Sequence, residues 1–304
     1  MNTQHENTIN TQKVYLSILL LICLIALGVI TSRATTAQQQ PQEVQEVQSF
    51  EAFNDLDLEA DSVYVWDVKN RQMLYGRNIE EQRPLASLSK IMTALVATEN
   101  LKEGSVRITG DDLIPEGDSG LEVGERWRIS DLIDFTLLVS SNDGARAIAG
   151  AVGGLQDMSF VERMNQRAQE LGLQNMYFNN PSGLDAHDLS NSGGYGSVRD
   201  IVHLFDYILR TNPSLLEATA KDALNFNSDI KMHQGENTNK IINDIPFVIA
   251  SKTGYTDLAG GNLVVAVDVA PNHPVILGVL GSTPQGRFWD IEKLYRATIQ
   301  HIKK

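Results

Sequence analysis

The chain has 304 residues, 42% of them hydrophobic, and a formal net charge of −13. This length holds one large domain or two modest ones, and the hydrophobic fraction is ordinary for a globular protein with a sizeable core. The acidic balance argues against nucleic acid as a partner, because phosphate backbones attract basic surfaces. It also indicates that any membrane attachment comes from a hydrophobic segment and not from a basic patch.

The N-terminus contains an uncharged apolar run, Val14 to Ile30, between polar flanks. About 17 residues lie at the short end of the range for a membrane-spanning helix. A cleavable signal peptide has a shorter apolar region of about 7–15 residues and an A-x-A-like site, for which Thr35-Thr36-Ala37 is the nearest candidate. We expect either an uncleaved anchor formed by residues 14–31 or a signal peptide removed on secretion. Both place the rest of the chain outside the cytoplasm.

Residues 34–50 are rich in Gln and almost free of large apolar side chains. This composition is typical of a flexible linker. We therefore expect three parts: a signal anchor or signal peptide over 1–33, a linker over 34–50 and one folded domain over 51–304.

The folded part has strand patterns near both ends and helical patterns between them. Period-2 alternation and β-rich runs bounded by turn residues predict the strands, and apolar residues at helical spacing predict the helices. The expected strands are 62–66, 73–75, 247–251, 262–269 and 274–280, and the expected helices are 88–101, 160–171, 198–209 and 287–302. Strands at both ends with helices between them predict one mixed sheet with an inserted helical region.

The segment Ser87-Leu88-Ser89-Lys90 is an S-x-x-K pattern at the expected start of a helix. Residues three apart on a helix lie on one face, so the Lys90 amine can reach the Ser87 hydroxyl. A serine hydroxyl needs a base before it attacks a carbonyl, and lysine serves when desolvation or a second cation lowers its pKa. Alone, the pattern is more typical of an N-capping serine followed by a surface lysine.

Two further short patterns follow in the chain. Ser140-Ser141-Asn142 comes after an apolar run, and in an extended turn the side chains of Ser140 and Asn142 would face the same way. Lys252-Thr253-Gly254 comes after an apolar strand; its lysine and threonine suit a substrate carboxylate, and its glycine would let a peptide lie close to the strand. Each is weak alone, but the order S-x-x-K, S-x-N, K-T-G, each in a fitting context, is a strong signal.

The chain resembles the serine-type D-alanyl-D-alanine carboxypeptidases, the low-molecular-mass penicillin-binding proteins, from about Asp61 to Leu294. The stretches that carry the resemblance are RPLASLSKIMTAL (83–95), LLVSSNDGA (137–145), ELGLQNMYFNNPSGLD (170–185), SVRD (197–200), ENTNKII (236–242) and SKTGYTDLAG (251–260). The resemblance implies a β-lactamase/transpeptidase-like fold of α/β (α+β) class: an antiparallel β-sheet flanked by helices, with an inserted all-helical subdomain.

The same resemblance implies an activity and its residues. The enzyme would remove the terminal D-alanine from peptidoglycan stem peptides through an acyl-enzyme at Ser87, and β-lactams would bind it covalently. Lys90 would act as the base, Ser140 would relay a proton to the leaving D-alanine, and Asn142 would hold the substrate amide.

The remaining implied roles concern substrate binding. Lys252 and Thr253 would bind the terminal carboxylate beside Gly254, and the backbone amides of Ser87 and Tyr255 would form the oxyanion hole. Arg287 resembles a family arginine near the carboxylate site. Arg199 is expected in a structural ion pair.

Other readings remain. A peptidoglycan DD-endopeptidase would carry the same motifs, since cleft shape distinguishes the two activities. A class A β-lactamase would need an E-x-x-L-N motif, and the nearest stretch, Glu170 to Asn175, has the wrong register. A non-catalytic wall-binding protein would not retain Ser87, Lys90 and Lys252 together.

No metal or organic cofactor is implied by the sequence. Asp185-Ala186-His187-Asp188 looks ligand-like, but no second histidine stands at metal-binding spacing, and His203 lies in a helical pattern. We therefore expect His187 to be a loop residue. The one cysteine, Cys23, lies in the N-terminal apolar run, so the folded part has no thiolate for zinc.

Overall fold

The computed structural model describes residues 46–47, 50–101, 103–113, 119–153 and 158–303. The chain divides into two units, Met1–Val44 and Gln45–Lys304, and every described residue belongs to the second. The expected anchor over residues 14–31 and nearly all of the expected linker lie outside the described residues. Across the part of the chain that is described, no helix combines the length and the apolar character needed to cross a membrane.

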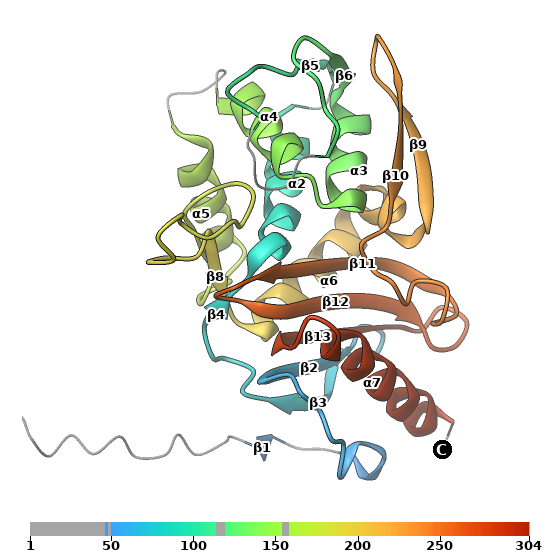
Figure 1. Cartoon of the computed structure of the whole chain (residues 1–304). Coiled ribbons are helices and arrows are strands. Elements are labelled where there is room, and N and C mark those ends of the chain that lie inside the picture. Colours follow the sequence, from blue (N-terminus) through green and yellow to red (C-terminus); the bar gives the residue numbers. More distant parts are fainter. Residues whose placement is uncertain (1–45, 48–49, 102, 114–118, 154–157, 304) are drawn as a thin grey trace, which may run out of the picture. The chain divides into compact units, whose positions relative to one another are not determined.

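The centre of the domain is a six-stranded antiparallel sheet (Figure 1). Its spatial order is β1-β3-β2-β13-β12-β11, which leaves β11 at one edge. The strands are β1 (Glu46–Val47), β2 (Ser62–Asp67), β3 (Gln72–Arg77), β11 (Val248–Thr256), β12 (Gly260–Asp268) and β13 (Pro274–Ser282). All five expected strands are therefore present, and the sheet is antiparallel throughout and not mixed.

Both faces of this sheet are buried, because successive side chains of a strand point to opposite faces. Val65 and Leu277 belong to the apolar cluster that includes α7 (Gly286–Ile302), whereas their neighbours Tyr64 and Ile276 belong to the cluster that includes α6 (Val198–Thr211). Helices thus cover both faces, which is the expected fold class. Figure 1 shows α7 against the sheet and the other helices on the far side.

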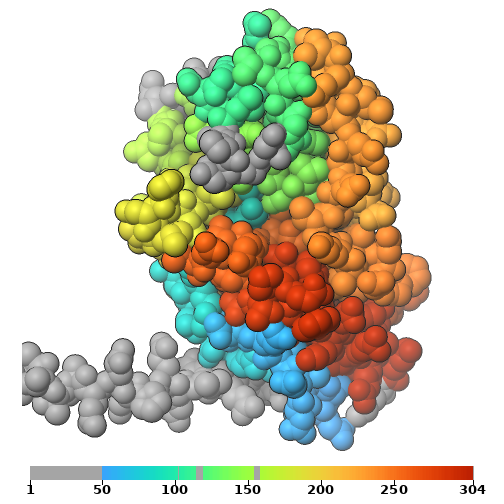
Figure 2. All heavy atoms as spheres, viewed as in Figure 1, coloured from blue at the N-terminus to red at the C-terminus, as the bar shows by residue number. Residues whose placement is uncertain are grey.

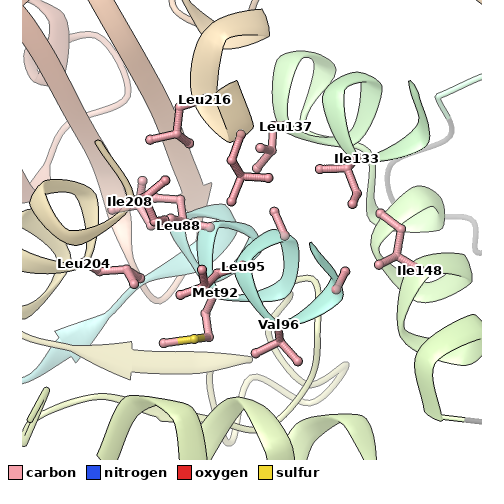
Figure 3. Packing of buried hydrophobic residues seen from close by; sticks show 14 of the residues in the cluster. Leu88, Met92, Leu95, Val96, Ile133, Leu137, Ile148, Leu204, Ile208 and Leu216 are labelled. Carbon is pink, nitrogen blue, oxygen red and sulfur yellow. The ribbon is translucent and has the colours of Figure 1, made fainter. Parts of the chain in front are cut away.

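The helical part packs around α2 (Ser89–Asn100), whose residues 89–97 are all buried. Around it lie α3 (Ile129–Val139), α4 (Asn142–Gly153), α5 (Phe160–Glu170) and α6. Figure 3 shows Met92 and Leu95 of α2 among leucine and isoleucine side chains from α3, α4 and α6. Residues 89–97 are therefore interior, and the polar side chains of Ser89, Lys90 and Thr93 are buried with the apolar ones. The expected helices over 88–101, 160–171, 198–209 and 287–302 are confirmed, and both ends of each helix agree within two residues.

Several short elements were not expected from the sequence. They are β4 (Arg83–Pro84), β5 (Ser105–Arg107), β6 (Arg126–Arg128), β7 (Tyr177–Phe178), β8 (Gly194–Gly196), β9 (Ala223–Asn227), β10 (Met232–Glu236) and the 3₁₀ helices η1 (Glu51–Phe53), η2 (Ala86–Leu88) and η3 (Pro213–Ala220). The β9–β10 hairpin stands beside α3, and β4, β8 and β7 form a small sheet next to η2. The β9–β10 hairpin and the small β4–β8–β7 sheet border the region where the three sequence motifs meet.

Candidate active site

Ser87 lies in the 3₁₀ turn η2, and Lys90 lies in the first turn of the helix α2 that follows it. The Nζ atom of Lys90 is 2.9 Å from the Oγ atom of Ser87, so the expected contact across three residues is present. Ser87 is half-buried, whereas the Lys90 side chain is completely buried. In Figure 2, atoms of the α2 segment lie at the bottom of a recess between the helical part and β11.

Two further oxygen atoms surround the Lys90 amine. It donates to Oδ1 of Asn142 at 2.7 Å and to the backbone carbonyl of Ser182 at 2.6 Å. Burial lowers the pKa of Lys90 well below its usual value, and the charge of Lys252 lowers it further. An amine with a depressed pKa can be neutral near physiological pH and accept a proton from Ser87.

Ser140 and Asn142 both reach the site, but not through the extended turn that we expected. Ser140 is the C-cap of α3 with φ 63° and ψ 36°, the left-handed region, and Asn142 begins α4. This sharp helix-to-helix turn brings both side chains to the site. Ser140 Oγ accepts a hydrogen bond from Lys252 Nζ at 2.8 Å, while Asn142 contacts Lys90.

The middle residue of this motif, Ser141, is buried and has its own structural contacts. Its hydroxyl accepts a hydrogen bond from the backbone N–H of Gly144 at 2.9 Å and lies 2.6 Å from the hydroxyl of Ser119. It therefore satisfies a donor in the first turn of α4, as side-chain oxygens at helix starts do. Ser141 supports the turn without entering the set of polar groups around Lys90.

Lys252 and Thr253 lie on the edge strand β11 and are both buried. Burial lowers the pKa of Lys252 from 10.5 to about 7, and the Arg287 guanidinium contributes to the shift. The Thr253 hydroxyl lies 2.6 Å from the hydroxyl of Thr238, which belongs to the ENTNKII stretch. Two cations close together lower each other's pKa and prefer an anion between them.

Gly254 also has a structural reason to lack a side chain. A Cβ atom at this position would lie 2.8 Å from the backbone oxygen of Leu85 and 3.3 Å from the Leu88 nitrogen. The glycine therefore lets the η2 turn that carries Ser87 pack directly against β11. The next residue, Tyr255, is 48% exposed.

Arg287 lies near Lys252, at the end of the site where the resemblance implies binding of the terminal carboxylate. Its Nη1 donates to the backbone oxygen of Gly254 at 2.6 Å, and its buried Nε has no hydrogen-bond partner among the described residues. Burial lowers the pKa of this guanidinium. A half-buried arginine with an unused donor close to Lys252 fits the recognition of an anion.

The loop after β7 contributes a group that the motif analysis missed, the Ser182 carbonyl that contacts Lys90. Asn180 Oδ1 holds the loop by accepting from the backbone nitrogens of Ser182 and Gly183 at 3.1 and 2.7 Å. Gly183 has φ +81°, and a Cβ there would lie 1.9 Å from the Ala86 oxygen. The P-S-G-L-D stretch was the available signal, but backbone carbonyls have no residue-type signature.

Two residues outside the site behave as expected. Arg199 forms an ion pair with Glu80 at 2.5 Å, which confirms its structural role. His187 is an exposed loop residue. Among the described residues, no three His, Cys, Asp or Glu side chains are arranged to hold a metal ion.

Residues 47–283 match the family model described as D-alanyl-D-alanine carboxypeptidase. The chain is 30% identical over 249 residues to the D-alanyl-D-alanine carboxypeptidase DacF of Bacillus subtilis, covering 79% of this chain but 62% of DacF. It is 31% identical over 238 residues to DacB2 of Mycobacterium tuberculosis, with coverage of 77% and 80%. It is also 33% identical over 214 residues to a D-alanyl-D-alanine endopeptidase of Haemophilus influenzae, with coverage of 67% and 69%. The chain thus spans less than two thirds of the length of DacF.

Solved structures of similar proteins share the fold. A D-alanyl-D-alanine carboxypeptidase from Mycobacterium tuberculosis superposes with a TM-score of 0.71 at 27% identity, covering 86% of this chain and 95% of that one. Penicillin-binding protein D2 from Listeria monocytogenes, in its ampicillin-bound form, superposes with a TM-score of 0.70 at 28% identity, covering 80% and 98%. The antiparallel sheet with its helical insertion is therefore the fold of penicillin-binding proteins.

Proposed function

The chain belongs to the D-alanyl-D-alanine carboxypeptidase family, and we propose that it removes the terminal D-alanine from peptidoglycan stem peptides through an acyl-enzyme at Ser87. The observation that carries this proposal is the completely buried Lys90 amine, which contacts Ser87 Oγ at 2.9 Å and Asn142 Oδ1 at 2.7 Å. A buried amine of depressed pKa next to a hydroxyl is the arrangement that activates a serine nucleophile.

In the acylation step, Ser87 Oγ attacks the carbonyl carbon between the two D-alanines while Lys90 accepts the hydroxyl proton. The developing oxyanion would be held by the backbone amides of Ser87 and Tyr255, which the packing of η2 against β11 keeps close. Asn142, which shares the Lys90 amine, would orient the substrate amide. The new bond joins Ser87 Oγ to the carbonyl carbon, first in a tetrahedral intermediate and then, after the C–N bond has broken, in the Ser87 ester.

The C–N bond then breaks and the amine of the leaving D-alanine takes a proton from Ser140. Lys252 donates to Ser140 Oγ at 2.8 Å and can replace that proton. Lys252, Thr253 and Arg287 would hold the terminal carboxylate, a role consistent with the buried Lys252 and the half-buried Arg287 standing close together at this end of the site. Water then attacks the Ser87 ester and gives a proton back through Ser140 to Lys252, while the departing Ser87 Oγ takes back the proton that Lys90 held, so both lysines return to their starting states.

The experiment for this proposal uses the purified enzyme and a pentapeptide that ends in D-Ala-D-Ala. Mass spectrometry detects a product lighter by one alanine, and a fluorescent penicillin labels the protein covalently. Neither result is expected from a protein that only binds cell-wall peptides. If the pentapeptide remains intact and no label is retained, the proposal is wrong.

A second candidate, DD-endopeptidase activity, is favoured by a hollow on the leaving-group side. This hollow of about 460 Å³ is lined by Ser119, Phe135, Val139, Ser140, Ser141, Gln234 and Glu236. It provides room next to Ser140 for a leaving amine larger than D-alanine. A crosslinked muropeptide offered beside the pentapeptide distinguishes the two activities, because only the endopeptidase splits it into two stem peptides.

The proposal also places the enzyme in the bacterial envelope, tethered by residues 14–31 or released after signal cleavage, with 34–50 as the linker and 51–304 as the catalytic domain. The uncharged composition of Val14 to Ile30 supports it. Mass spectrometry of the protein purified from membranes gives the N-terminus. An intact N-terminus in an alkali-resistant membrane fraction supports the anchor, and a start near residue 38 in the soluble fraction supports cleavage.

A further inference from the structure

The β9–β10 hairpin is joined to the helical part by a buried polar cluster that the proposed mechanism does not use. Glu125, just before β6, is completely buried, and its Oε2 accepts a hydrogen bond from the indole nitrogen of Trp127 at 2.7 Å. Nε2 of His233, a buried residue of β10, lies 2.9 Å from the same oxygen, across 108 residues of sequence. An ionised carboxylate only accepts hydrogen bonds, so His233 Nε2 is the donor.

The surroundings of this contact make it costly to break. The His233 ring packs against the rings of Trp127 and Phe135, with centroids 4.7 and 5.8 Å away. Oε1 of Glu125 has no hydrogen-bond partner among the described residues, and Nζ of Lys231 lies 3.7 Å from it. A buried carboxylate carries a desolvation cost that its hydrogen bonds and neighbouring cations must offset. Removing the carboxylate would leave the indole and imidazole donors buried without a partner.

The opposite face of β10 forms a wall of the leaving-group hollow. Successive side chains of a strand point to opposite faces, so Gln234 and Glu236 face away from His233. Both line the hollow of about 460 Å³, together with Val139 of α3. Gly235 lies between them, and a Cβ there would be 2.9 Å from Val139 Cγ1. The hairpin therefore packs closely against the C-terminal end of α3, beside which it stands in Figure 1.

We propose that Glu125 and His233 are positioning residues for the leaving-group side of the site. Their contact fixes β10 against α3, and β10 in turn fixes the wall that a leaving residue larger than D-alanine would touch. The inference rests on the proposed function and assigns a role in it to two residues outside the three sequence motifs. D-Alanine itself depends little on this wall, because its side chain is a single methyl group.

The test compares two peptides, Nα,Nε-diacetyl-L-Lys-D-Ala-D-Ala and Nα,Nε-diacetyl-L-Lys-D-Ala-D-Leu, which differ only in the leaving residue. Release of the free D-amino acid by the full-length enzyme gives kcat/KM for each peptide. The ratio of the D-leucine value to the D-alanine value isolates the leaving-group side. Glu125→Ala removes the buried contact, and Gly235→Ala disturbs the hairpin independently, because the new Cβ displaces Val139.

Asp67→Ala is the matched control. Asp67 is an equally buried carboxylate whose Oδ2 lies 2.9 Å from Nε2 of His273, but this pair joins the end of β2 to the turn before β13. Neither residue lines the hollow. Both alanine variants take a buried carboxylate away from a histidine, so urea unfolding should show a lower midpoint in each. Only Glu125→Ala should change the substrate ratio, because only this variant loosens β10.

In Glu125→Ala and Gly235→Ala we expect the ratio to fall about tenfold, as a small displacement near the reacting groups allows. Glu125→Gln keeps an oxygen for the Trp127 indole and should restore the ratio to within about twofold of the wild type. Penicillin labelling of every variant reports an intact nucleophile. Should Glu125→Ala fail to fold, the ratio in Gly235→Ala decides alone.

A ratio that is unchanged in Glu125→Ala, or that falls equally in Asp67→Ala, overturns the inference. A wild type that releases D-alanine but no D-leucine also overturns it. The proposed function stands in each of these cases. Release of neither amino acid by the wild type overturns the proposed function itself.

Discussion

The backbone carbonyl of Ser182 accepts a hydrogen bond from the Nζ atom of Lys90 at 2.6 Å, across 92 residues of sequence. Together with the contacts to Ser87 and Asn142, this contact holds the amine at three oxygen atoms. It depends on the loop from Asn180 to Gly183, which Asn180 holds by two backbone hydrogen bonds. The position of the proposed base is thus determined by a segment without a catalytic motif.

The first prediction concerns Gly183 in that loop. A Cβ at this residue would lie 1.9 Å from the Ala86 oxygen, and φ +81° disfavours any side chain. We expect Gly183→Ala to lower the free energy of unfolding by about 2–4 kcal/mol and to slow penicillin acylation, because the turn with Ser87 must move. Urea unfolding and the rate of labelling measure the two effects.

Gly172→Ala is the matched control, since Gly172 also has positive φ, +72°, but its Cβ would meet nothing within 4 Å. Backbone strain alone then costs about 1–2 kcal/mol and leaves acylation unchanged. Equal acylation rates in the two variants would contradict the claim that the loop positions the nucleophile turn.

The second prediction concerns the nucleophile. Ser87→Ala is expected to abolish both D-alanine release and covalent penicillin labelling. Ser89→Ala removes a hydroxyl two residues away, one that is buried without a partner among the described residues. That change should preserve labelling and cost little stability, because an unsatisfied buried oxygen is lost. Labelled Ser87→Ala protein, seen on a gel, would remove Ser87 from its proposed role.

The sheet and the long helices were predictable because their signals are local. The alternation in Ser62 to Trp66 and the apolar spacing of Ile91, Met92 and Leu95 remain visible whatever surrounds them. The β9–β10 hairpin was missed because MHQGE is mostly polar and only Phe226 of ALNFN is buried, so neither strand shows a clear apolar alternation. One side of that hairpin is exposed, so the strands are defined by their backbone pairing and not by an apolar pattern.

The candidate site was likewise predictable only where its signals are local in sequence. The S-x-x-K spacing predicted the contact between Ser87 and Lys90, because both residues lie in one continuous helical segment. The left-handed conformation of Ser140 was not predictable, since it results from the crossing of α3 and α4. The packing of Gly254 against the backbone of Leu85 was not predictable either, because Leu85 is distant in sequence.

The third prediction concerns Asn142, which accepts from the Lys90 amine. Asn142→Ala removes a preorganised group, and we expect kcat/KM to fall about 100-fold or more. Asn142→Asp instead places a negative charge 2.7 Å from Nζ, which raises the pKa of Lys90 and keeps it protonated to higher pH. The acid limb of the rate profile should therefore move upward in Asn142→Asp and not in Asn142→Ala. Identical profiles would show that Lys90 does not control this limb.

The fourth prediction is the pH dependence of kcat/KM. Lys90 must be neutral to accept a proton, so activity rises with pH through its lowered pKa. Lys252 must be charged to hold the carboxylate, and with a pKa of about 7 its loss of charge lowers activity above that pH. Lys252→Arg keeps the charge and should extend activity to higher pH at a reduced maximum. Constant wild-type activity from pH 7 to 9 would contradict the role of the Lys252 charge.

The fifth prediction concerns the pH dependence of stability that follows from the lowered pKa of Lys252. Burial lowers the pKa of Lys252 from 10.5 to about 7, so between these values the unfolded chain binds a proton that the folded chain does not. Stability from this group therefore rises with pH from about 7 to 10.5, and below 7 the full cost of a buried ammonium remains. Lys252→Met is expected to raise the free energy of unfolding by about 1–4 kcal/mol at pH 6. The gain should shrink as the pH approaches 10, while D-alanine release is lost at every pH.

Urea unfolding at pH 6 and 9 measures the gain in the free energy of unfolding. Lys240→Met, at an exposed lysine, is the control and should show no such trend. A gain of the same size at both pH values would mean that the folded protein does not hold Lys252 at a lowered pKa.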